Sequence, residues 1–180
     1  MANPTEIRSS DIPWRILVWG GLAALLCVPL VAMRFTDEVD WSPFDFLIVG
    51  GLFAVVGGCA ELALRLSRNW TYRVGFAVAV VTGFLTLWVN MAVGMIGGEQ
   101  NPANLVFLGV LLVAVVGAIV GRFRPNGMAL TMVGTAVAQA WAAFYAVTLG
   151  ESRDAVFIAG FCVLWLAAAG LFRLSRPRAV

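Results

Sequence analysis

Among the polar side chains within the long apolar stretches of this chain, seven are the residues best placed for chemistry. Glu61 is the one carboxylate inside such a stretch, and Arg65 follows it four residues later. The other five carry hydroxyl or amide groups: Thr82, Asn90, Thr131, Thr135 and Gln139. If these stretches cross a membrane, a charge within them is costly, which makes Glu61 a candidate for ion binding or proton exchange.

A structural interpretation competes with this one, and we favour it. A Glu and an Arg one helical turn apart can neutralise each other near the inner interface, where the arginine reaches headgroup water. Hydrogen bonding between helices is likewise the favoured role for Asn90 and Gln139, ahead of contact with a substrate.

A second set of candidates is acidic and lies between or at the ends of the apolar stretches. It consists of Asp37, Glu38, Asp40, Asp45 and Glu99. Such carboxylates could bind a divalent cation, but their spacing is not that of an EF-hand loop. We favour a solvated outer face that sets the orientation of the protein, and we predict no metal site.

The residue types that are missing narrow the chemistry further. The chain has no His, and all twelve basic residues are Arg, so the commonest general base and the side chain that forms Schiff bases are both absent. Cys27, Cys59 and Cys162 fall in three separate apolar stretches and show no Cys-x-x-Cys spacing. We therefore predict no catalytic residue and no cofactor.

Composition identifies the solvent of most of this chain as lipid. Of its 180 residues, 61% are hydrophobic, and the mean hydropathy is +0.91, which is far too apolar for a soluble domain of this size. The charges cluster between apolar stretches long enough to cross about 30 Å of hydrocarbon. The predicted fold is all-α, a single polytopic transmembrane helical bundle with six spans, at about 14–33, 44–66, 72–97, 103–121, 128–149 and 155–172.

Charge sign predicts the orientation of these spans. With the N-terminus in the cytoplasm, ten arginines lie inside: Arg8, Arg15, Arg65, Arg68, Arg73, Arg122, Arg124, Arg173, Arg176 and Arg178. Only Arg34 and Arg153 then lie outside, which is a strong positive-inside pattern. Both termini are expected in the cytoplasm, and the protein is expected in the inner membrane of a cell.

Short turns and small residues predict how the spans begin and pack. Ser42-Pro43 and Asn101-Pro102 are both typical helix starts, in which Asn101 caps through its side-chain oxygen. Small and polar residues recur at three- and four-residue steps, which predicts helix-packing faces. They are Gly50, Ala54, Gly58, Glu61 and Arg65 in the second span; Gly75, Ala79, Gly83, Thr86, Asn90 and Gly94 in the third; and Gly127, Thr131, Thr135 and Gln139 in the fifth.

Two stretches carry a resemblance. They are Phe35-Thr-Asp-Glu-Val-Asp-Trp41 and Trp88-Val-Asn-Met-Ala-Val-Gly-Met-Ile-Gly-Gly-Glu-Gln-Asn-Pro-Ala-Asn104. Through them the chain resembles a group of small, uncharacterised multi-pass bacterial inner-membrane proteins, and the resemblance extends over most of its length. The resemblance implies the membrane class and assigns no catalytic residue.

Three functions remain open from the sequence. The first is a non-catalytic membrane protein, an accessory or helix-packing subunit that associates with itself or with a larger membrane complex; its glycine-rich faces and short loops favour this one. The second is a small channel or carrier for an ion or small solute, with the polar residues of the spans lining a route. The third is an intramembrane enzyme, whose chemistry would have to rest on carboxylates alone. The lipid bilayer is the predicted partner, and no nucleic acid is expected.

Overall fold

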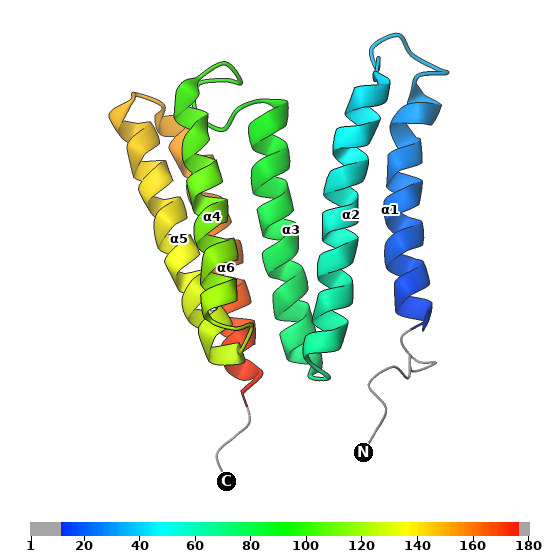
Figure 1. Cartoon of the computed structure of the whole chain (residues 1–180). Helices are drawn as coiled ribbons and strands as arrows, with labels where there is room; N and C mark the ends of the chain where they lie inside the picture. Colours follow the sequence, from blue (N-terminus) through cyan, green and yellow to red (C-terminus); the bar gives the residue numbers. More distant parts are fainter. Residues whose placement is uncertain (1–11, 177–180) are drawn as a thin grey trace. The chain divides into compact units, whose positions relative to one another are not determined.

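The computed structural model describes residues 12–176, and within them the chain is helical with no strand. The elements are α1 (Ile12–Ala32), α2 (Pro43–Leu66), α3 (Trp70–Ala92), the 3-10 helix η1 (Pro102–Leu105), α4 (Val106–Val120), α5 (Pro125–Thr148) and α6 (Ser152–Leu174) (Figure 1). Six helical segments in this range, with η1 and α4 taken as one, are long and apolar enough to cross a membrane. The predicted all-α membrane fold is confirmed. Arg8 and Arg178, which the positive-inside pattern places in the cytoplasm, lie outside the described residues.

The chain divides into two compact units, the first ending at Arg65 and the second beginning at Leu66. The sequence-based expectation of one continuous domain therefore stays a prediction.

The first unit is an antiparallel hairpin of α1 and α2 (Figure 1). A Cβ atom added to Gly57 of α2 would lie only 2.6 Å from Cη2 of Trp19 on α1, and one added to Gly50 would lie 3.7 Å from Cδ2 of Leu26. The two helices therefore meet where α2 carries glycine, because a small residue makes room for a large side chain. None of the side chains in the spanning part of α1 is fully buried.

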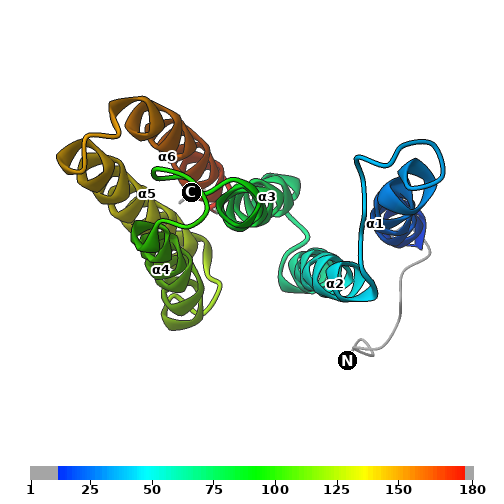
Figure 2. The same cartoon turned by 90° about the horizontal axis from the view of Figure 1, so that it is seen from above.

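The second unit is a bundle in which α6 packs against both α3 and α5, while α4 packs against α5 (Figure 2). Its core includes Phe107 and Val110 from α4, Ala142 from α5, and Ile158 from α6. Small residues bring the helices close, since a Cβ at Gly75 of α3 would lie 3.1 Å from Cβ of Leu171. The predicted faces of α3 and α5 are confirmed as packing faces: Gly75, Ala79, Thr86, Thr131, Thr135 and Gln139 are all buried.

The predicted packing face of α2 is corrected at two of its small residues. Ala54 and Gly58 are exposed, and a Cβ at Gly58 would meet no atom within 4 Å. Gly57 is the buried glycine that meets α1. Spacing alone could not distinguish two adjacent glycines, because either fits a three- or four-residue step.

The end of the third span is also corrected. The helix stops at Ala92, five residues before the predicted Gly97. Gly94 takes a φ of +68°, which favours glycine and ends the helix. Met95 and Ile96 extend the apolar stretch in the sequence, yet they are buried in the connection to η1. All other predicted span ends agree with the helices to within three residues.

Candidate functional site

Glu61 is paired across the first unit with a residue on the other helix. Nη2 of Arg15 on α1 donates to Oε2 of Glu61 on α2 over 2.7 Å. Trp19 lies one turn further along α1 and packs on Gly57, one turn earlier on α2. The side chains of Arg15 and Glu61 are 26% and 21% exposed, so the pair is largely shielded, and each charge has its counter-charge.

This pairing replaces the predicted Glu61–Arg65 pair. Arg65 is exposed in the last turn of α2 and makes no ion pair with Glu61 among the residues described. The reason is that Glu61 is on the α2 face that packs against α1, where Arg15 can reach it. Arg65 instead fits the usual place of a basic residue at a helix C-terminus.

The threonines of the second unit bond to their own helices. The hydroxyl of Thr82 donates to the carbonyl of Val78 (2.7 Å), that of Thr86 to Thr82 (2.8 Å), and that of Thr135 to Thr131 (2.9 Å). Such bonds to the carbonyl four residues earlier satisfy the hydroxyl without a partner helix. Thr131 instead packs its side chain on α4, where a Cβ at Gly117 would lie 2.6 Å from Cγ2 of Thr131.

Gln139 is fully buried and joins α5 to α6. Its Nε2 donates to the carbonyl of Ile158 over 3.3 Å, whereas its Oε1 has no partner in the described part of the chain. The same holds for Oδ1 of Asn90 on α3 and Nε1 of Trp165 on α6. Unpaired buried groups of this kind are costly in an apolar interior.

Helix register places two of these unpaired atoms at one level of the bundle. Gly83 faces Trp165, since a Cβ there would lie 3.6 Å from its Cη2. Asn90 lies seven residues, about two turns, further along α3. Because α6 runs antiparallel to α3 (Figure 1), the same step along α6 from Trp165 leads to Ile158, the residue that Gln139 bonds. Asn90 and Gln139 therefore share a level of the second unit.

The seven intramembrane candidates do not form one set. Glu61 and Arg65 belong to the first unit, and the other five belong to the second. Within the second unit, Thr131, Thr135 and Gln139 share the buried face of α5, and Thr82 is buried on α3.

The acidic candidates have separate roles. Asp45 forms a reciprocal cap with Ser42 at the start of α2: its Oδ2 accepts from the Ser42 N–H (2.7 Å) and hydroxyl (2.8 Å), and its own N–H donates to Ser42 Oγ (3.3 Å). This confirms the predicted Ser42-Pro43 helix start. Glu99 is exposed in the second unit.

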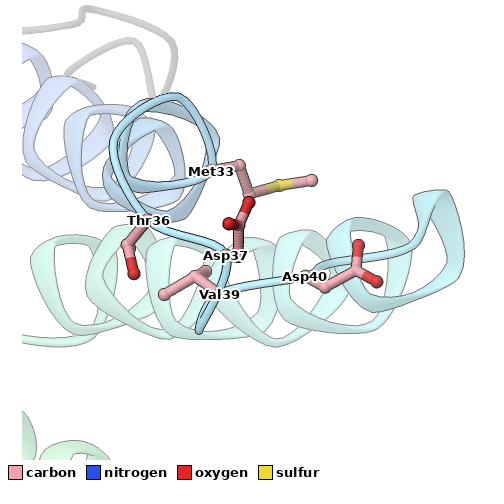
Figure 3. A pocket seen from close by; sticks show the side chains of 5 residues that line it. All are labelled: Met33, Thr36, Asp37, Val39 and Asp40. Carbon is pink, nitrogen blue, oxygen red and sulfur yellow. The ribbon is translucent and has the colours of Figure 1, made fainter.

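Asp37 and Asp40 line a shallow hollow in the α1–α2 loop. Its other lining residues are Met33, Thr36 and Val39. Figure 3 shows the two carboxylates pointing in different directions. Among the described residues, no three His, Cys, Asp or Glu side chains lie close enough together to hold a metal ion.

The sequence reasoning missed two residues that organise the α3–α4 connection. Buried Asn104 accepts at Oδ1 from the N–H groups of Met95 and Ile96, both at 2.9 Å, and donates from Nδ2 to the carbonyls of Ile96 (3.3 Å) and Gly98 (2.7 Å). Asp154 of α6 accepts from the N–H of Gly97 over 2.8 Å. The sequence signal that could have identified Asn104 was its place after the Gly97-Gly98 pair and three residues after the Asn101 cap.

Fold and polar residues together define a multi-pass integral membrane protein, with helices built around a few internal polar bonds. No family model, curated protein or solved structure matches the chain.

Proposed function

We propose that this is a non-catalytic integral membrane protein of a bacterial inner membrane, which acts as a self-associating helix-packing subunit. The most direct support comes from the ion pair and the hydrogen bonds that the polar groups of the spans make. Glu61 is neutralised by Arg15, and Thr82 and Thr135 bond carbonyls of their own helices. Side chains engaged in this way are poorly placed to act on a substrate.

The exposed surface of α1 supports self-association. Gly20 and Gly21 would each accept a Cβ with no atom within 4 Å, and Leu17 and Leu25 on the same helix are exposed. A helix from a second copy of the chain could approach closely at such glycines, because close backbone packing drives association in lipid.

Native mass spectrometry from lipid nanodiscs tests this proposal. We expect complexes with more than one copy of the chain, and we expect Gly20→Leu and Gly21→Leu to shift them toward single copies. Gly134→Leu is the matched control, since Gly134 is also open but lies on α5. A single copy at every protein concentration and lipid composition would reject self-association.

A small channel or carrier is the second candidate, and the unpaired oxygens of Asn90 and Gln139 favour it. Two acceptors without donors at one level of a helical bundle could bind a small solute that carries hydrogen-bond donors. Flux in proteoliposomes under an imposed gradient tests this idea, and Gln139→Leu is expected to abolish it. No wild-type flux of the ions and solutes tested would count against a carrier.

A further inference from the structure

The turn between α4 and α5 contains a backbone conformation that the rest of the described chain reserves for glycine. Arg122 and Phe123 have φ values of 51° and 55°. Every other positive φ in residues 12–176 belongs to a glycine: Gly94, Gly97, Gly98 or Gly150. A side chain in this left-handed region carries a steric cost, because its Cβ crowds the following carbonyl.

Two contacts of Phe123 account for its left-handed backbone conformation. Its carbonyl accepts from the hydroxyl of buried Tyr72 over 2.6 Å, and its ring lies 6.5 Å from that of Phe76, centroid to centroid. The neighbouring Gly121 is needed for a different reason, since a Cβ there would lie 2.9 Å from Cα of Gly127. These contacts hold the turn rigidly against α3 and α5.

Among the described residues, no comparable contact accounts for the left-handed conformation of Arg122. Its side chain is exposed, and it makes no ion pair or side-chain hydrogen bond with any described residue. Glycine would satisfy the backbone at this position at lower cost. An arginine in a disfavoured conformation, with no ion pair or side-chain hydrogen bond to the described residues, indicates that the side chain serves something outside the protein.

The surroundings of Arg122 show which chemistry fits. The α4–α5 turn, the start of α3 and the end of α6 lie at the same end of the second unit (Figure 1). The described charges near this end are all arginines: Arg68, Arg73, Arg122, Arg124, Arg173 and Arg176. The acids of this unit lie at its opposite end: Glu99 and Glu151 in the connections and Asp154 in the first turn of α6.

We infer that Arg122 and Arg124, presented by the rigid α4–α5 turn, form a binding site for the phosphate of an anionic phospholipid headgroup. A guanidinium binds phosphate oxygens through two parallel N–H bonds, which an ammonium group cannot do. The turn directly follows the apolar helix α4, so its side chains lie at the depth of the headgroups in the bilayer that the helices cross. The charges of Arg122 and Arg124 complement an anionic lipid surface without any further group from the protein.

The experiment compares lipid binding by the purified full-length protein and by variants of single arginines. Native mass spectrometry would count the phosphatidylglycerol or phosphatidylcholine molecules retained as each lipid is titrated into detergent-solubilised protein. We expect the wild type to retain phosphatidylglycerol preferentially. Arg122→Gly should weaken this binding about fivefold, the scale expected for one basic residue at an anionic surface.

The same variant provides an internal control for folding. Because glycine suits a φ of 51°, Arg122→Gly should leave the thermal stability unchanged or raised, so weaker lipid binding could not be attributed to unfolding. Arg122→Lys should bind less tightly than the wild type, since it keeps the charge but loses the two-pronged contact.

Two further variants separate a site from diffuse charge. Arg153→Gln removes a positive charge from the opposite end of the unit, and Arg176→Gln removes one from the same end but outside the turn. Both should bind phosphatidylglycerol nearly as the wild type does. Equal losses for Arg122→Gly and Arg176→Gln, or no preference of the wild type for phosphatidylglycerol over phosphatidylcholine, would overturn the proposal.

Discussion

Arg15 and Glu61 come from different helices, and their pairing determines the electrostatics of the first hairpin. Burying one charge of such a pair without the other is costly, whereas the pair itself contributes modestly when it is partly exposed. At 26% and 21% exposure, the two side chains are neither fully solvated nor fully buried. The pair therefore joins α1 to α2 and contributes only modestly to the free energy of unfolding.

A double-mutant cycle tests this pairing. Arg15→Gln and Glu61→Gln should each destabilise the protein, and the double variant should lose less than the sum, with a coupling free energy on the order of 1 kcal/mol. Chemical unfolding in one lipid or detergent measures all four proteins. The control cycle uses Arg65→Gln with Glu61→Gln, and a coupling of equal size there would restore the local Glu61–Arg65 pair.

The identity of the Glu61 partner shows where sequence reasoning stops at this scale. Spacing along one helix predicts contacts three and four residues apart, and Arg65 satisfies that rule. Arg15 is 46 residues away from Glu61, and nothing in either local sequence states which face of α1 meets α2. The cap by Asn101 was predictable because it is local. Oδ1 of Asn101 accepts from the N–H of Ala103, two residues later, over 3.0 Å.

At the scale of elements, the buried side chain of Asn104 makes four hydrogen bonds to the backbone of the α3–α4 connection. Asn104→Ala should lower the free energy of unfolding by about 2–3 kcal/mol, because it leaves the buried N–H groups of Met95 and Ile96 without an acceptor. Asn101→Leu should cost about 1 kcal/mol and Asn101→Ser almost nothing, as expected for a helix cap.

Hydrogen exchange would show whether this loss is local. The amides of Met95 and Ile96 should lose protection in Asn104→Ala and keep it in Asn101→Ser. Full protection in both variants would mean that these amides do not depend on Asn104.

Packing of α4 on α5 gives a second prediction for the elements. Gly117→Ala should destabilise the protein by about 1–3 kcal/mol, because the new Cβ would lie 2.6 Å from Cγ2 and 3.2 Å from Cβ of Thr131. Gly109→Ala on the same helix is the matched control, since no atom lies within 4 Å of its Cβ, and alanine favours helix. Thermal unfolding in one detergent compares them, and similar midpoints for the two variants would exclude a close α4–α5 contact at Gly117.

The elements themselves were largely predictable, because an apolar stretch of about 20 residues has few alternatives to a helix in lipid. The end of α3 was not predictable from hydropathy. Met95 and Ile96 are as apolar as the residues of the helix, but the fold buries them in a connection whose N–H groups are satisfied by Asn104. Hydropathy identifies residues that avoid water. It does not distinguish a helix from a loop whose backbone N–H groups are satisfied by a polar side chain.

At the scale of the whole molecule, the segregation of charge predicts which side of the membrane each loop faces. Asp40 lies in the loop between α1 and α2, Glu151 lies between α5 and α6, and Ser67 lies between α2 and α3. If all six helices cross the membrane in succession, the first two loops are expected on one side and the third on the other. The excess of arginine near Ser67 predicts that this side is the cytoplasm.

Cysteine labelling in intact cells tests this orientation. In a background from which Cys27, Cys59 and Cys162 have been removed, single cysteines at positions 40 and 151 should react with a membrane-impermeant thiol reagent added outside. A cysteine at position 67 should react only after the cells are permeabilised, which also controls for its accessibility. Because all three positions lie in loops outside the helices, their labelling reports sidedness with little influence from packing. Labelling at position 67 in intact cells, with positions 40 and 151 protected, would invert the topology and move the arginine-rich end of the second unit to the outer surface.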